Sequence, residues 1–166
     1  MGRISEDTTV CPGCGTAIDR SGGFCPACGS IDDRPRVCTI HPAVRAEGVC
    51  VLCRMPFCKK CGKRSAGVFL CDPHRSCEIQ EGMVRVYGTI DVLQAGYVGG
   101  VLEQAGCHPF LFSRSANPNA DLVAITKIPR GYGVGGHPIE DQRVFVPFDE
   151  YQRAVATLKE LGLYDE

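Results

Sequence analysis

Residues 38–74 read CTIHPAVRAEGVCVLCRMPFCKKCGKRSAGVFLCDPH. This stretch contains four pairs of potential metal ligands: Cys38/His41, Cys50/Cys53, Cys58/Cys61 and Cys71/His74. Two residues separate the members of each pair, so both side chains of a tight turn can point at one ion. A single CxxC pair also occurs in redox proteins, but four consecutive pairs indicate two tetrahedral zinc sites.

A second repeat precedes this stretch. Cys11-Pro-Gly-Cys14-Gly and Cys25-Pro-Ala-Cys28-Gly are nearly identical, and ten residues lie between them. Proline favours the turn, and the glycine after each pair lets the backbone fold beneath the sulfur atoms. The pattern at residues 11–30 resembles a minimal zinc ribbon. A reactive dithiol pair and an iron site are the alternatives, and the ribbon spacing favours zinc.

The composition indicates a reducing compartment. The chain has 166 residues and 12 cysteines. Its first ten residues are polar, with Glu6 and Asp7 where a secretory signal would need an apolar core, and we expect residues 1–10 to be a disordered lead. The longest run of small or apolar residues, 95–102, is too short to cross a bilayer. We therefore predict a cytoplasmic protein whose paired cysteines bind metal rather than form disulfides.

The charge distribution argues against nucleic acid as a partner. Residues 1–81 carry 11 Lys/Arg and 9 Asp/Glu, a formal charge of +2, whereas residues 82–166 carry 7 and 10, a formal charge of −3. Ten ligand thiolates and three zinc ions would lower the first value to about −2. A nucleic-acid-binding protein requires a clear basic surface, so we expect the basic residues between the pairs to form a solvated face.

The four central pairs resemble a B-box-type zinc finger, and residues 37–76 would form this module. The resemblance rests on CTIHP at 38–42, CVLC at 50–53, CKKC at 58–61 and CDPH at 71–74. It implies that the ligands interleave, whereas spacing alone also allows neighbouring pairs to share an ion. The nine residues between Cys61 and Cys71 are a longer arm than the family usually has.

The ligand count predicts three closed, structural sites. Because a catalytic zinc normally keeps one position open for water, twelve protein ligands for three ions indicate a structural role. The predicted ligands are Cys11, Cys14, Cys25 and Cys28 for the first zinc, and, by the B-box resemblance, Cys38, His41, Cys58 and Cys61 for the second, and Cys50, Cys53, Cys71 and His74 for the third. Cys77 is a surplus thiol, and Cys107 is expected to pack in a core.

The second half shows the periodicity of a small α+β domain. Residues 83–87 alternate as a strand does, and Asp91 is a suitable N-cap for a helix whose apolar residues recur through residues 95–105. Further strands are predicted at 110–112 and 143–147. A last helix, capped by Asp149 with Gln152 in a capping box, would bury Ala154, Val155, Leu158 and Leu161.

Residues 83–164 also resemble a domain of prokaryotic signal-transducing proteins that has no known function and a PII-like, ferredoxin-like fold. The matching segments are VRVYGTID at 84–91, LEQAG at 102–106 and VFVPFDEYQRAVATL at 144–158. Residues 113–142 form an insert, in which an extra strand is predicted at 122–128 and residues 131–136 match GxGxxG. That glycine-rich match lacks the following helix of a dinucleotide site, so we expect a loop.

These observations predict a cytoplasmic, bacterial protein of α+β class in which a zinc ribbon and a B-box-like module precede a ferredoxin-like sandwich. No residue pattern indicates catalysis. The expected function is a non-enzymatic interaction or regulatory module with three structural zinc ions and a protein partner, or self-association. A sensor that loses zinc on thiolate oxidation, and a ribbon that contacts nucleic acid, are the alternatives.

Overall fold

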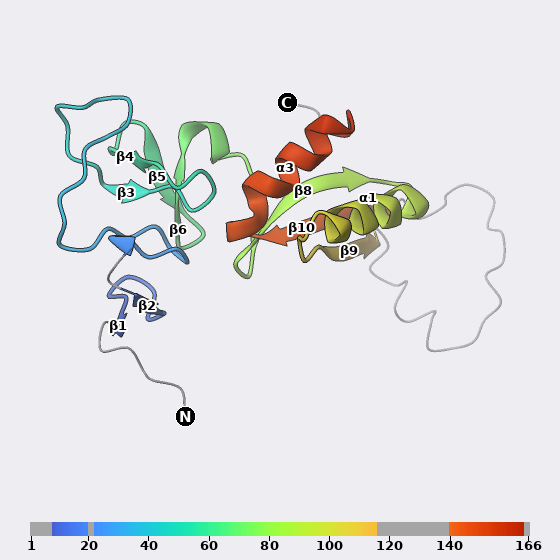
Figure 1. Cartoon of the computed structure of the whole chain (residues 1–166), viewed down its shortest axis with the longest axis horizontal. Helices are drawn as coiled ribbons and strands as arrows, with labels where there is room; N and C mark the ends of the chain where they lie inside the picture. The colour runs from blue at the N-terminus through green and yellow to red at the C-terminus, as the bar shows by residue number, and fades with distance from the viewer. Residues whose placement is uncertain (1–7, 20–21, 116–139, 165–166) are drawn as a thin grey trace. The chain divides into compact units, whose positions relative to one another are not determined.

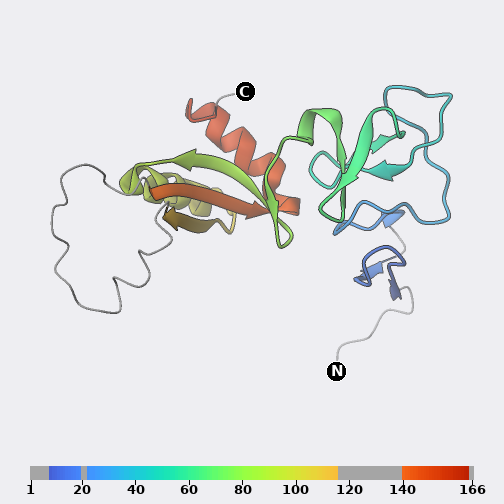
Figure 2. The same ribbon diagram turned by 180° about the vertical axis from the view of Figure 1, so that it is seen from behind.

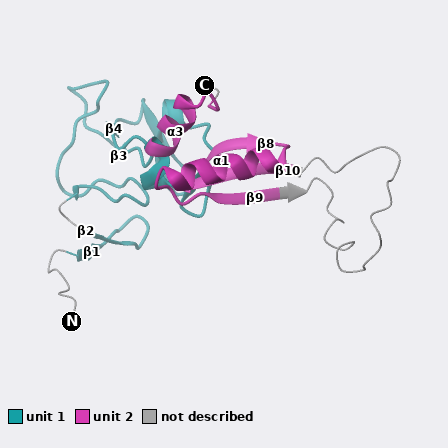
Figure 3. Cartoon of the chain, turned by 45° about the vertical axis from the view of Figure 1, so that its right-hand side comes forward, with its two compact units in different colours: residues 1–84, 147–152 teal, residues 85–146, 153–166 magenta. Residues whose placement is uncertain are grey.

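The computed structural model describes residues 8–19, 22–115 and 140–164. The chain forms two compact units, coloured separately in Figure 3. Unit 1 contains residues 1–84 and 147–152, and unit 2 contains residues 85–146 and 153–166. The expected strand at 122–128 and the glycine-rich loop at 131–136 lie outside the described residues.

Unit 1 consists of short antiparallel hairpins. β1 (Thr8–Val10) pairs with β2 (Ala17–Asp19), β3 (Gly48–Val49) pairs with β4 (Pro56–Phe57), and β5 (Gly62–Ser65) pairs with β6 (Val68–Cys71). A short 3-10 turn, η2 (Asp72–His74), and strand β7 (Ile79–Gln80) follow. Thr8–Val10 therefore form a strand, and the prediction that the whole of residues 1–10 is disordered was wrong for these three.

Strand β6 forms the centre of unit 1. All four of its residues are buried, and Phe69 is almost completely inaccessible to solvent. Gly48 and Gly62 lie directly against the Phe69 ring, where a Cβ atom would clash with it. The turn before β6 places Ala66 and Gly67 at positive φ, which is the geometry of a two-residue hairpin turn. Phe69 thus shares the core of unit 1 with other buried apolar side chains, among them Val49, Leu52 and Leu70.

Unit 2 provides a mixed α and β architecture. Its elements are β8 (Met83–Thr89, which begins in unit 1), α1 (Val92–Gln104), β9 (Phe110–Ser115), β10 (Glu140–Pro147), η3 (Phe148–Glu150) and α3 (Tyr151–Glu160). The sheet has the strand order β7-β8-β10-β9. The opposite views of Figures 1 and 2 show α1 on one face of this sheet. The presence of both helices and strands agrees with the predicted α+β class.

The first half of unit 2 follows the sequence prediction closely. The Asp91 side chain accepts hydrogen bonds from the N–H groups of Leu93 and Gln94 and so caps α1. Ala95, Val98 and Leu102 are buried on one face of this helix, as predicted. Gly106, with φ of 77°, follows its end. The observed strands at 83–89, 110–115 and 140–147 include the predicted ones and extend further.

The last helix differs from its prediction at three residues. Asp149 lies inside η3 and does not cap it. The N-cap of η3 is Pro147, and no side chain makes a capping hydrogen bond there. The Gln152 amide donates to the carbonyl of Leu52 instead of completing a capping box. Ala154 and Leu158 are buried as expected and Val155 is partly buried, but Leu161 follows the end of the helix and is exposed. In the described ranges, no helix has the length and apolarity that crossing a membrane would require.

Candidate metal centres

The twelve predicted ligands gather in three groups of four. Within each group the potential ligand atoms all lie within 4.8 Å of one another, and none of the chain's cysteines forms a disulfide. We name the groups site 1 (Cys11, Cys14, Cys25, Cys28), site 2 (Cys38, His41, Cys58, Cys61) and site 3 (Cys50, Cys53, Cys71, His74). Sites 2 and 3 interleave along the chain, which is the grouping that the B-box resemblance implies and not the sequential one.

Local backbone geometry explains how the cysteine pairs form. In three pairs, the residue after the second cysteine has positive φ: 74° at Gly15, 76° at Gly29 and 58° at Arg54. Its N–H donates to the carbonyl of the first cysteine, at 2.8–2.9 Å. This bond closes a tight turn and directs both sulfur atoms to the same side. Glycine adopts this conformation without strain, whereas Arg54 adopts it at a cost.

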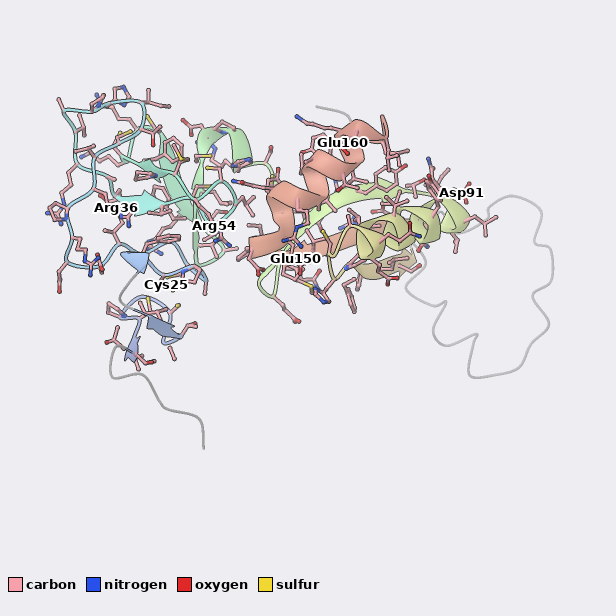
Figure 4. The ribbon with its side chains drawn as sticks, viewed as in Figure 1. Cys25, Arg36, Arg54, Asp91, Glu150 and Glu160 are labelled. Atoms are coloured by element: carbon pink, nitrogen blue, oxygen red, sulfur yellow. The ribbon has the colours of Figure 1, made fainter. Side chains whose placement is uncertain are left out.

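Site 1 brings together two cysteine pairs, Cys11/Cys14 and Cys25/Cys28. Each sulfur atom of the first pair lies close to one of the second pair: 3.6 Å separate the sulfur atoms of Cys11 and Cys28, and 3.6 Å separate those of Cys14 and Cys25. Cys25, labelled in Figure 4, lies among these sulfur atoms and is fully buried, whereas Cys14 is exposed. Site 1 is therefore the group with an exposed cysteine ligand, whereas the exposed ligand of site 2 is His41.

Sites 2 and 3 each combine three cysteines with one histidine. In site 2, Nδ1 of His41 lies 3.2 Å from the Cys61 sulfur and 3.7 Å from the Cys58 sulfur. In site 3, Nδ1 of His74 lies 3.1 Å from the Cys71 sulfur and 3.5 Å from the Cys50 sulfur. The same nitrogen of each imidazole thus faces the sulfur atoms, as expected of two ligands of the same kind.

The spacing of these atoms fits a tetrahedral zinc ion. With Zn–S bonds of about 2.3 Å, a tetrahedral site holds its sulfur atoms about 3.8 Å apart. The sulfur–sulfur distances here run from 3.6 Å in site 1 to 3.9 Å between Cys53 and Cys71. Sulfur and imidazole donors are also the ligands that structural zinc sites use. The donor set and its geometry therefore fit the metal that the sequence predicts.

The protonation of sites 1 and 2 shows why a cation suits them. In site 1, burial raises the pKa of Cys25 to about 12, whereas at Cys28 burial is outweighed by hydrogen bonds with Ser30, Cys14 and Cys11, which together lower the pKa to about 6. In site 2, burial raises the pKa of Cys61 to about 12. Burial would also raise the pKa of Cys38, but backbone hydrogen bonds lower it to about 6. Each group thus holds a thiolate beside a thiol, and a divalent cation would replace the remaining proton.

Site 3 shows the same division and includes its histidine. Hydrogen bonds with Cys53 and Cys71 lower the pKa of Cys50, whereas hydrogen bonds with Cys50 and Cys53 raise the pKa of Cys71. Hydrogen bonds with the same two cysteines raise the pKa of His74 to about 9. Without a metal, the positive charge beside the Cys50 thiolate is therefore a protonated imidazole. A metal ion would take over this role and bind the neutral ring.

Two hydroxyl groups support site 1, and the sequence analysis missed both. The Cys14 sulfur lies 3.3 Å from the hydroxyl oxygen of Thr16, and the Cys28 sulfur lies 3.1 Å from that of Ser30. The signal was present in the repeat, because CPGCGT and CPACGS both place a hydroxyl two residues after the second cysteine. Hydrogen bonds of this kind stabilise thiolates and orient metal ligands.

Arg64, on β5, holds the second half of site 1. Its guanidinium donates to the Ser30 hydroxyl at 2.6 Å and to the Cys28 carbonyl at 3.4 Å. Arg64 is one of the basic residues between the cysteine pairs that were expected to form a solvated face, so its contacts with Ser30 and Cys28 correct that expectation. A neighbouring arginine, Arg36, donates to the Gly22 carbonyl at 2.9 Å and covers the Phe24 ring. Two of the basic residues thus hold loops of unit 1 in place.

The two surplus cysteines lie apart from these groups. Cys77 is partly buried, and its N–H donates to the carbonyl of His74. Cys107 is 3% exposed and follows the end of α1, so the prediction that it packs in a core is confirmed. Among the described residues, no further group of histidine, cysteine or acidic side chains has metal-binding geometry.

Comparison of the chain with protein-family models, with curated proteins and with solved structures gives no match.

Proposed function

We propose that this chain is a non-enzymatic protein that binds three structural zinc ions and acts as a protein-interaction or regulatory module. The observation that carries the proposal is that each group offers four protein ligands in tetrahedral spacing. A zinc ion held by four protein ligands has no open position for water or substrate, so it stabilises structure instead of activating a reactant. Unit 1, with its very short strands, is the kind of fold that needs such ions.

The loops around sites 2 and 3 supply the feature that an interaction module requires. Four large apolar side chains are exposed there: Val37, Ile40, Val44 and Met55. Backbone hydrogen bonds from Cys38 to Val44 and from Cys50 to Met55 hold their loops against the cysteine pairs. Metal-pinned loops would present these side chains in a fixed arrangement, with little entropy lost on binding.

The finer parts of the proposal extend the sequence resemblances. The central module is proposed to be B-box-like, and the C-terminal domain to be ferredoxin-like and related to prokaryotic signal-transducing proteins. The proposed location is the bacterial cytoplasm, where reducing conditions keep cysteines available as ligands. The partner is a second protein or another copy of this chain.

Native mass spectrometry combined with zinc X-ray absorption tests the structural role. Three zinc ions per chain, with sulfur and nitrogen as the only ligands, are expected. Fewer than three ions, or a coordinated water oxygen, would contradict the closed structural sites. For the interaction role, a photo-crosslinking residue at Ile40 should form protein adducts in cells, whereas one at Ala66 in the β5–β6 turn should not.

The alternative of a redox sensor is favoured by one observation, the exposure of Cys14 in site 1. Peroxide would oxidise an exposed thiolate ligand to a sulfenic acid, with water as the other product, and the oxidised ligand would release zinc. Loss of one zinc under mild peroxide, with the remaining two retained, would favour the sensor over the purely structural role.

A further inference from the structure

A segment from the C-terminal half of the sequence covers site 3. Residues 147–152 belong to unit 1 by their contacts, although the chain on either side of them belongs to unit 2. Within this segment Phe148, Glu150 and Tyr151 are buried. A segment that enters and leaves the other unit within six residues requires specific contacts to hold it.

Tyr151 makes the first of these contacts. Its ring meets the ring of the site 3 ligand His74 edge to face, with 5.3 Å between the ring centroids and an angle of 88° between the planes. This arrangement is a favoured geometry for aromatic pairs. Tyr151 is 5% exposed, so its contact is made inside the unit rather than on its surface.

Gln152 makes the second contact, on the opposite arm of the same site. Its side-chain amide donates to the carbonyl of Leu52 at 3.3 Å. Leu52 lies between the ligands Cys50 and Cys53, whereas His74 belongs to the arm that begins at Cys71. Two consecutive residues therefore contact both of the chain segments that a metal ion in site 3 would bind together.

The position of the His74 ring depends on that metal ion. His74 ends η2, a single 3-10 turn in which no residue is buried. Such a short turn does not fix a side chain by packing, whereas a bond from Nδ1 to a metal would fix both the position and the plane of the ring. A partner that packs against the ring therefore contacts a surface that the metal has ordered.

We infer that Tyr151 and Gln152 form the outer wall of site 3 and couple its metal to residues 147–152, which include the first two residues of α3. The inference rests on the proposed metal binding and adds a regulatory consequence to it. Loss of the metal from site 3 releases the segment, and loosening of the segment weakens the hold of site 3 on its metal. These effects are reciprocal, because a coupling free energy acts equally in both directions.

The first test starts from the segment. Tyr151→Leu removes the aromatic contact, and Tyr151→Phe retains the ring as a matched control. Full-length variants are exposed to a zinc chelator, bound zinc is counted by native mass spectrometry, and alkylation of cysteines identifies the emptied site. Tyr151→Leu should speed zinc loss from site 3 by about fivefold, which corresponds to the usual worth of an aromatic pair, and Tyr151→Phe should not. Unchanged loss from site 3 in Tyr151→Leu would overturn the inference.

The second test starts from the metal. His74→Cys keeps four ligands but removes the ring, and His41→Cys makes the same exchange in site 2 as a control. Hydrogen exchange at residues 148–154 should be faster in His74→Cys than in wild type, with three zinc ions retained, and unchanged in His41→Cys. Equal exchange in both variants would overturn the coupling. A wild-type chain without zinc would instead reject the proposed function, so the two failures are distinguishable.

Discussion

The N–H of Val49 donates to the carbonyl of Gly29 at 2.9 Å, and this bond joins β3 to the second cysteine pair of site 1. The N–H of Phe69 makes the adjacent bond, to the carbonyl of Cys28 at 3.0 Å. One half of site 1 is thus built into the centre of unit 1, while the other half belongs to the β1–β2 hairpin. This asymmetry distinguishes two glycines that look equivalent in the sequence.

The first prediction compares Gly29→Ala with Gly15→Ala. Both glycines have positive φ, so both substitutions cost about 1 kcal/mol of backbone strain. At Gly29 the new Cβ would also overlap the carbonyl oxygen of Val49 and meet the Phe69 side chain, whereas at Gly15 it would meet no atom within 4 Å. Gly29→Ala should therefore lower the free energy of unfolding by about 3 kcal/mol or more. Equal losses in chemical denaturation of the two zinc-loaded variants would contradict this argument.

The second prediction concerns Arg64. Arg64→Ala removes the two hydrogen bonds to Ser30 and Cys28, and the loss of about 1 kcal/mol should speed zinc release from site 1 about fivefold. Lys63→Ala, on the same strand and also exposed, is the control. Chelator-driven release followed by native mass spectrometry measures the effect. Faster release from all three sites would show instead that the substitution disturbs unit 1 as a whole.

The third prediction tests the interleaved grouping by counting zinc. Cys38 and Cys58 belong to one site in the structure, so the double variant Cys38→Ser, Cys58→Ser should lose one zinc and keep two. Cys38 and Cys50 belong to different sites, so Cys38→Ser, Cys50→Ser should lose two and keep one. Sequential pairing would reverse these counts, because Cys38 and Cys50 would then share an ion.

The metal ligands could be predicted from the sequence because a pair separated by two residues forms its turn locally. Asp91 was likewise predictable, since an N-cap acts on N–H groups two and three residues away. The role assigned to Gln152 was wrong because a partner distant in the sequence, the Leu52 carbonyl, takes its amide. Tyr151 gave no signal for the same reason, as its contact with His74 exists only after the chain folds.

The fourth prediction concerns pH and site 3. Hydrogen bonds with Cys50 and Cys53 raise the pKa of His74 from 6.5 to about 9. In the metal-free protein the protonated ring stabilises the fold fully below about pH 6.5, and this stabilisation is lost as the pH rises through about 9. Zinc needs the neutral ring, so the His74 proton competes with zinc, and the affinity of site 3 should rise more steeply with pH below about 9 than above it.

Competition with a chromophoric chelator at several pH values measures this affinity. The double variant Cys38→Ser, Cys58→Ser lacks site 2, and adding Cys11→Ser and Cys28→Ser removes site 1 as well, so that site 3 is measured alone. An affinity that stays constant between pH 7 and pH 9 would contradict the protonation of His74 in the metal-free site.

The last prediction addresses unit 2 through the cap of α1. Asp91→Ala removes the acceptor for the N–H groups of Leu93 and Gln94, whose hydrogen bonds measure 2.8 and 3.2 Å. Substitution of an N-cap by alanine costs about 1 kcal/mol, and asparagine retains most of the capping, so Asp91→Asn is the matched control. Because Asp91 lies in unit 2 and the three metal groups lie in unit 1, the zinc content should remain at three in both variants.

Thermal unfolding followed by circular dichroism should show a lower midpoint for Asp91→Ala alone. A lower midpoint accompanied by loss of zinc would mean that the helix cap and the metal groups unfold as one cooperative system.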